Sequence, residues 1–212
     1  EFQLKGSGRT PFSRSGDGRA ALRSSVREFL AKEGMHFLGV PTARALSLVV
    51  DTELKIQRQW YPEAQNKDEQ AAILTRVSPS FLRVGQVELF AKENTATTGS
   101  WPADVSGQKQ KAKESQRTLP HEQEALDDAQ ASSLLTVKNL KIFLLIFAHR
   151  LAFLHAEWLR VGYVQGNMNS DNCLLNGYSL DYGPFGFLEQ FDPLWCPWIG
   201  GGEKFSYSQQ PK

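Results

Sequence analysis

Residues 167–186, NMNSDNCLLNGYSLDYGPFG, place several oxygen-bearing side chains around a short apolar run. Asp171, Asn172 and Asp181 offer two carboxylates and an amide oxygen, the ligand types that hard cations prefer. Mg²⁺ is usually held by one or two carboxylates, while waters and substrate phosphates supply the remaining oxygens. Asn, Asp, Ser and Gly are also the common residues of turns, so this segment alone supports a metal site and an ordinary turn equally.

The pair Asn176-Gly177 predicts how these oxygens are brought together. Asn-Gly between apolar residues is the strongest short-range signal for a two-residue β-hairpin with a type I′ turn. In that register Asn172 faces Asp181. Directly opposed side chains share one face of the hairpin, with Cβ atoms about 4.5–5.5 Å apart. We therefore expect Asn172 and Asp181 to share one cation.

A second set of charged residues lies earlier in the chain. Lys5 ends a short apolar strand pattern and Glu28 lies in the helical pattern that follows, and each alone is typical of a surface charge. Together with Asp171, Asn172 and the later Asp181-x-Gly they follow the order of the catalytic residues in protein kinases. An ordinary kinase has several residues between its loop Asp and Asn, preceded by His-Arg-Asp, whereas here Asp171 and Asn172 are adjacent. An ordinary protein kinase is therefore a poor match.

Apolar periodicity predicts the elements that position these residues. A helix is expected from Arg19 to about Leu38, with Asp17 as its N-cap and with Gly39 and Pro41 marking its end. A long amphipathic helix follows much later. The predicted strands span residues 2–5, 43–51, 54–61 and 71–77, and the long helix spans about 133–159.

The order of these elements indicates the organisation of the chain. A β-rich part, residues 1–80, precedes a helix-rich part, residues 81–212, which fits an α+β fold with two lobes. Residues 91–131 are polar and lack a clear period, so we expect a mobile insertion there. The chain begins without Met and ends without an evident terminus, so we expect an internal fragment of a longer protein.

Composition excludes several classes of protein. The 212 residues carry a net charge of +1, which argues against a protein that coats nucleic acid or an anionic membrane. Two cysteines make neither a disulfide framework nor a zinc site, and they fit a reducing compartment. The longest apolar run, residues 142–148, is far shorter than the about 20 residues that span a bilayer, so no membrane insertion is expected.

Four blocks of the sequence resemble one known family. QLKGSGRTPFSRSGDGRAALRSSVREFL, TRVSPSFLRVG, NMNSDN and DYGPFGFLEQFDP occur in the order found in the SelO family, also called YdiU, the selenoprotein O pseudokinases. The resemblance covers nearly the whole chain except the insertion after Lys92. It implies a protein-kinase-like bilobal fold and transfer of AMP from a flipped ATP to hydroxyl side chains of proteins. It also implies a mitochondrial location in a eukaryote or a cytoplasmic one in a bacterium.

The resemblance also implies roles for individual residues. Asp171 matches the family's proposed catalytic base, and Asn172 and Asp181 match its ligands for Mg²⁺ or Mn²⁺, with Asp181 also at the nucleotide. Lys5 matches the nucleotide-binding lysine and Glu28 its helix partner. The remaining nucleotide-binding positions are Asp17, Gly18, Arg76 and Arg83. The family's glycine-rich nucleotide loop would lie upstream of this chain, and Gln165 stands where the family usually has His.

Three functions follow from these residues. The first is a Mg²⁺-dependent protein adenylyltransferase, whose partners are ATP and proteins that offer Ser, Thr or Tyr. The second is a kinase-type phosphotransferase, because the same acids serve either reaction. The third is a catalytically silent nucleotide-binding scaffold, which the full set of acids disfavours. The remaining arginines of the first helix and its preceding loop, Arg14, Arg19, Arg23 and Arg27, are interpreted as solvated surface charges.

Overall fold

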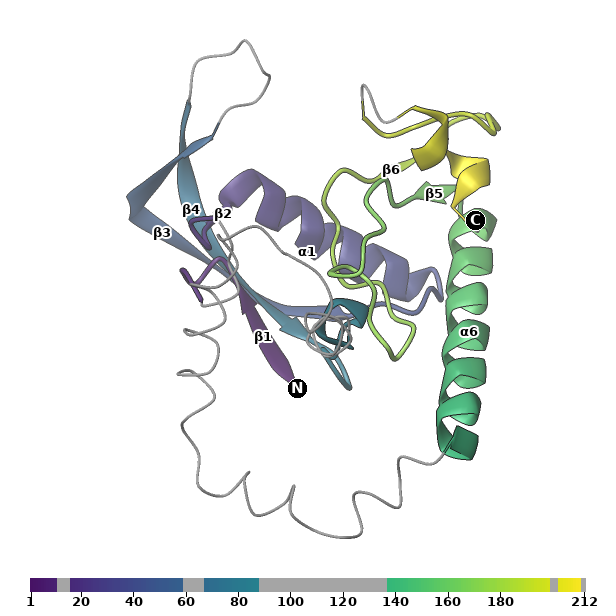
Figure 1. Cartoon of the computed structure of the whole chain (residues 1–212). Coiled ribbons are helices and arrows are strands. Elements are labelled where there is room, and N and C mark those ends of the chain that lie inside the picture. The colour runs from purple at the N-terminus through teal and green to yellow at the C-terminus, as the bar shows by residue number, and fades with distance from the viewer. Residues whose placement is uncertain (11–15, 59–66, 88–136, 199–201, 211–212) are drawn as a thin grey trace, which may run out of the picture.

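The computed structural model describes residues 1–10, 16–58, 67–87, 137–198 and 202–210. They form an antiparallel sheet with one long helix, α1, packed against it, and a C-terminal part that begins with a second long helix, α6 (Figure 1). The expected insertion at 91–131 lies outside the described residues. Mixed helices and antiparallel strands agree with the α+β class predicted from the sequence.

The sheet is organised around one central strand, β4 (Lys67–Val77). β1 (Phe2–Lys5) and the short β2 (Ala20–Ala21) pair with one edge of β4, and β3 (Arg44–Arg58) pairs with the other. The predicted strands at 43–51 and 54–61 are wrong as separate elements. A single strand β3 runs through the described residues of both. The register with β4 is interrupted at the polar residues between Val50 and Lys55 and resumes at Lys55, as at a β-bulge. Residues 59–61 lie outside the described residues.

Helix α1 (Leu22–Phe37) carries Glu28 on its buried face. The predicted N-cap at Asp17 is wrong, since the helix begins after Ala21, which pairs with β4 and provides no side-chain cap. The C-terminal end agrees with the prediction, because the helix ends at Phe37 and Gly39 adopts a φ of +81°. Pairing of residues 20–21 with the sheet therefore fixes where α1 starts.

The C-terminal part packs against α1 through the last turns of α6 (Val137–Arg160). It continues with a two-stranded pair, β5 (Tyr163–Val164) and β6 (Gly186–Phe187), and two short 3₁₀ turns, η2 (Glu203–Phe205) and η3 (Tyr207–Gln209). The indole N–H of Trp158, which is almost fully buried, donates to the Ser179 hydroxyl 2.9 Å away. The shared core consists of Ala31, Met35, Val40, Leu154, Trp158, Tyr163, Tyr182 and Phe185.

The first half of α6 is apolar and largely uncovered. Val137 and Leu145, for example, expose 71% and 72% of their surface. By length and composition α6 could cross a membrane, with 11% of its most apolar stretch buried. Core helices of soluble proteins pass the same test, so this is weak evidence, and the expected lack of membrane insertion stays a prediction.

The segment that follows β5 does not form the predicted hairpin. The amide of Gly177 donates to the carbonyl of Leu174, and the antiparallel bridge joins Cys173 to Ser179, so the register differs by one residue from that of a type I′ hairpin. Leu174, which would face Ser179 in that hairpin, instead bridges to Arg83. The predicted pairing of residues 172 and 181 is therefore wrong.

Tertiary packing explains the changed register. Leu174 and Leu180 are both buried in a cluster with Ala43 and Phe81, which belong to distant parts of the chain. The backbone at residues 173–175 bonds to residues 82–84, and Ser179 bonds to residues 41–43. These partners compete with the local hairpin, and burial of Leu174 and Leu180 against them favours the observed register.

Candidate active site

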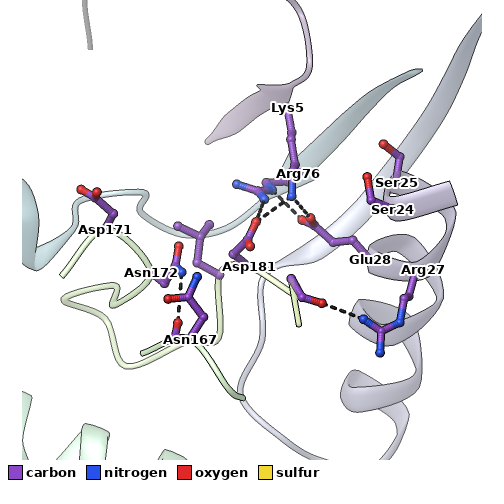
Figure 2. A network of polar contacts seen from close by, with 12 residues as sticks. Lys5, Ser24, Ser25, Arg27, Glu28, Arg76, Asn167, Asp171, Asn172 and Asp181 are labelled. Carbon is purple, nitrogen blue, oxygen red and sulfur yellow. Dashed lines mark hydrogen bonds and ion pairs between the residues drawn. The ribbon is translucent and has the colours of Figure 1, made fainter. Parts of the chain in front are cut away.

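Four charged side chains meet between the sheet, α1 and residue 181 (Figure 2). The Lys5 Nζ lies 2.5 Å from Glu28 Oε2 and 2.8 Å from Asp181 Oδ1. The Arg76 Nε lies 2.7 Å from Glu28 Oε1, and its Nη2 donates to Asp181 Oδ1. Each carboxylate thus binds both cations. We call Lys5, Glu28, Arg76 and Asp181 the ion-pair cluster.

The strand pairing explains why the two cations point to the same place. Gln3 lies opposite Arg76 in the β1–β4 register, and Lys5 follows two residues later on β1. Side chains two residues apart on a strand, and those directly opposite, share one face of a sheet. Glu28 faces them from α1, and it and Arg76 are almost fully buried. The predicted pair of Lys5 and Glu28 is therefore formed.

A third cation, Lys32, lies beside the cluster and was missed by sequence reasoning. It follows Glu28 by one helical turn, its Nζ lies 3.4 Å from Glu28 Oε1, and its side chain is fully buried. Its ammonium also donates to the main-chain carbonyl of Leu180. The i,i+4 spacing from Glu28 was the available signal. When Lys32 is protonated, Lys5, Arg76 and Lys32 give three positive charges against the two carboxylates of Glu28 and Asp181.

The cluster shifts the pKa values of its members. Burial by itself would raise the pKa of Asp181, but attraction to Lys5 and Arg76 outweighs it and lowers the pKa well below its usual value. The pKa of Glu28 is lowered in the same way, against the effect of its burial. Burial, with repulsion from Arg76, lowers the pKa of Lys32 to about 7. Both carboxylates are therefore ionised at neutral pH.

Two arginines share a neutral acceptor next to the cluster. The Gln3 Oε1 accepts hydrogen bonds from Arg76 Nη1 at 3.0 Å and from Arg83 Nη2 at 3.1 Å. The Nη1 of Arg83 donates to the carbonyl of Asp171 at 3.2 Å. Burial, followed by repulsion from Arg76, lowers the pKa of Arg83. Gln3 was also missed, although its place two residues before Lys5 puts it on the same face of β1.

Asp171 and Asn172 lie on a turn built by Asn169. The side-chain oxygen of Asn169 accepts from the backbone N–H groups of both residues at 3.1 Å, and Asn172 Nδ2 donates to the Asn167 carbonyl at 3.1 Å. A Cβ atom at Gly85 would lie 2.7 Å from Asp171 Oδ1, so a side chain there would require the Asp171 carboxylate to move. In the view of Figure 2, Asn172 lies between Asp171 and Asp181.

The donor set fits a metal ion that is shared with a ligand. Within the described residues, no group of three His, Cys, Asp or Glu side chains gathers to hold a metal alone. An amide and a carboxylate, from Asn172 and Asp181, suit Mg²⁺ or Mn²⁺ when waters and phosphate oxygens complete the coordination. The residues present therefore fit a nucleotide-associated metal better than a structural one.

Asp17 and Gly18 lie on a separate loop. The Asp17 carboxylate accepts two hydrogen bonds from Arg58 and one from the Arg19 amide, all at 2.9 Å. Gly18 has a φ of +68°, and a Cβ there would lie 2.0 Å from the carbonyl oxygen of Gly8. These contacts hold the loop to the end of β3 and do not join it to the ion-pair cluster.

Two residues near Asp181 have roles that the sequence did not predict. Gln165, at the position where His was expected, is buried, and its Nε2 donates to the main-chain carbonyl of Asp181 at 2.8 Å. Arg27 was interpreted as a solvated charge. It is partly exposed, but its guanidinium donates to the carbonyls of Gly183, at 2.7 Å, and Phe185. The solvated interpretation of Arg27 is therefore wrong for its charged end.

Comparisons with known proteins agree on one family. The family model described as "Protein adenylyltransferase SelO" matches residues 1–212. Proteins named "Protein nucleotidyltransferase YdiU" are 41% identical in Methylobacillus flagellatus, 41% in Azoarcus sp. and 43% in Nitrosospira multiformis. Each match covers 100% of this chain but 38%, 38% and 35% of the relative, respectively. The chain thus spans less than two fifths of the length of these relatives.

Proposed function

The chain belongs to the SelO family, and from that membership we propose that its protein transfers AMP from ATP to Ser, Thr or Tyr hydroxyls of other proteins. The observation that supports this most directly is the ion-pair cluster. A strand lysine bound to a helix glutamate, next to the Asp of an Asp-x-Gly sequence, is the arrangement that organises the phosphates of ATP in protein kinases. We extend the proposal to the fold, with a kinase-like bilobal division at about residue 80.

The cations of the site suit a triphosphate. Arg76 and Arg83 present planar forks of N–H donors that match phosphate oxygens, and Lys5 adds a compact charge. Gln3 holds the two guanidiniums side by side without neutralising them. Lys5, Arg76 and Arg83 gather three cations around Gln3 and Asp181, and such a group of cations attracts an anionic ligand.

Asn172 and Asp181 would hold the metal ion. Mg²⁺ or Mn²⁺ bound there would neutralise negative charge on the phosphate oxygens. Asp181 suits this role because its lowered pKa keeps the carboxylate ionised. Asn172 suits it because Asn167 and Asn169 hold the turn on which it lies.

Asp171 would act on the acceptor hydroxyl. It would orient the hydroxyl and take its proton as the hydroxyl oxygen bonds to the α-phosphorus of ATP. The bond from that phosphorus to its bridging oxygen breaks, and pyrophosphate leaves. Arg83 donates to the main-chain carbonyl of Asp171, so the anion-binding and acid–base parts of the site are connected.

ATP labelled at either the α- or the γ-phosphate tests this function on the full-length protein. Retention of the α label alone on protein supports AMP transfer, and Asp171→Asn should reduce it by at least a hundredfold, within the range expected for a general base. Retention of the γ label alone would instead show a phosphotransferase. If neither label is retained while ATP still binds, the protein is a nucleotide-binding scaffold.

A further inference from the structure

Side chains hold the main chain around Asp181 at four carbonyl groups. The carbonyl of Leu180 accepts from Lys32, and the carbonyl of Asp181 accepts from Gln165 at 2.8 Å. The carbonyls of the next two odd-numbered residues, Gly183 and Phe185, both accept from the guanidinium of Arg27. Two of these three donors, Arg27 and Lys32, come from α1.

Arg27 binds this segment in a way that depends on its shape. Its two terminal nitrogens reach two carbonyls, and its Cζ lies 3.9 Å from the centroid of the Phe185 ring. A planar guanidinium can make both hydrogen bonds and stack on an aromatic ring at once, whereas a lysine ammonium cannot. Phe185 belongs to the core between α1 and α6, so the bonded segment is anchored at its far end.

Lys32 holds the segment on the other side of Asp181. Its ammonium is fully buried between Glu28 and the Leu180 carbonyl, 5.2 Å from the centroid of the Tyr182 ring. Burying a charged amine is unfavourable, and an apolar side chain of similar volume often gives equal or better stability. Glu28 already has ion pairs with Lys5 and Arg76. The bond to Leu180 is therefore what Lys32 adds to this site.

We infer that Arg27 and Lys32 are positioning residues, which place the Asp181 carboxylate by fixing the main chain before and after it to α1. They lie on either side of Glu28 along the helix, so one element sets the positions of both carboxylates in the ion-pair cluster. A displacement of α1 from the sheet moves Asp181 as well as Glu28. The inference rests on the proposed function, because it assumes that Asp181 binds the metal and the nucleotide.

The test measures Mn²⁺ binding to the full-length protein by electron paramagnetic resonance, with a non-hydrolysable ATP analogue present. Arg27→Gln and Lys32→Met should each raise the Kd for Mn²⁺ by about tenfold or more, as losses of outer-shell partners do. Hydrogen exchange of the amides at 180–186 should also quicken. Arg23→Gln is the matched control, because Arg23 lies one turn earlier on α1 and pairs with Glu69.

Several outcomes separate this inference from the proposed function. If Arg27→Gln unfolds at the wild-type temperature and leaves both Mn²⁺ affinity and amide exchange unchanged, the inference is wrong. Arg27 is partly exposed, so Arg27→Gln tests the inference even if Lys32→Met fails to fold.

If the wild type binds Mn²⁺ and the variants bind it more weakly, but no AMP is transferred, the proposed function is wrong and the positioning role stands. If the wild type binds no Mn²⁺, both the proposed function and the positioning role are wrong. Rescue by Arg27→Lys would show that charge alone suffices and would contradict the role given to the planar fork.

Discussion

Gln3 shows how a neutral residue can set the electrostatics of a site. Two guanidiniums that approach one another repel, and an amide oxygen between them stabilises the arrangement while both keep their charge. A carboxylate in that place would also accept the two hydrogen bonds, but it would cancel much of the positive charge. Replacing Gln3 with Glu therefore keeps the two hydrogen bonds and changes the charge of the site.

We predict that Gln3→Glu weakens ATP binding. The new carboxylate should pair with Arg76 and Arg83 and compete with phosphate oxygens for them. The expected rise in Kd is about tenfold to a hundredfold, as for the loss of a hydrogen bond to a charged group. Equilibrium binding of a fluorescent ATP analogue measures it, with Gln3→Met as the control that removes the acceptor without adding charge. A Kd for Gln3→Glu equal to that of the wild type would show that these arginines do not bind the phosphates.

At the scale of elements, local signals succeeded where the partners are near in sequence or follow a regular period. The strand at 2–5, the first helix and the long helix were predicted from apolar periodicity, and the structure contains all three. Asn176-Gly177 failed as a hairpin signal because the neighbouring leucines bury against residues from distant parts of the chain. Arg27 was misjudged for the same reason, since its acceptors lie 156 and 158 residues away.

The site divides in the same way. Lys5, Glu28 and Asp181 were predicted from the order of residue types, and the structure brings them together. Lys32 and Gln3 were missed, although the i,i+4 spacing from Glu28 and the alternation along β1 were available signals for their positions. Their hydrogen-bond partners, the Leu180 carbonyl and two arginine side chains, are distant in the sequence, and no pattern of residue types identifies them. Hydrogen bonds to the backbone depend on three-dimensional placement and leave little trace in the sequence.

Two glycines in these elements should respond oppositely to alanine. Gly6 follows Lys5 with a φ of +95°, and a Cβ there would lie 2.4 Å from the Ala72 carbonyl oxygen, so Gly6→Ala should destabilise the fold by about 1–3 kcal/mol. Gly34 lies inside α1 with nothing within 4 Å of an added Cβ, so Gly34→Ala should stabilise it by about 0.5–1 kcal/mol. Urea unfolding measures both. Equal changes in the free energy of unfolding would contradict the close contact at Gly6.

At the scale of the whole molecule, the ion-pair cluster should make stability depend on pH in acid. The pKa of Asp181 is lower in the folded state than its ordinary value of 3.8, so the unfolded state takes up the proton first as the pH falls. The stability contributed by Asp181 is complete above about pH 5 and decreases as the pH falls through 3.8 and below. Lys32, with a pKa of about 7 when folded, is protonated in both states in this range and adds no slope.

Asp181→Asn should therefore flatten the acid branch of the stability curve. The measurement is the free energy of unfolding by urea at several pH values between 3 and 6, compared as slopes for wild type and variant. Comparing slopes removes the uniform loss of stability that follows from breaking the ion pairs. If the two slopes coincide, Asp181 is not held as an ion in the folded protein.

The spacing of the ion-pair cluster along the chain sets the order in which it can form during synthesis. Lys5, Glu28, Lys32 and Arg76 all leave the ribosome before Asp181, which follows Arg76 by 105 residues. At typical bacterial and eukaryotic elongation rates this interval lasts roughly 5–20 s. Throughout it, Glu28 faces Lys5, Arg76 and the Lys32 side chain without Asp181, and repulsion among the cations opposes their burial. Packing of the nascent helix on the sheet is thus favoured once the last carboxylate has been made, which couples maturation of the N-terminal part to translation of the C-terminal part.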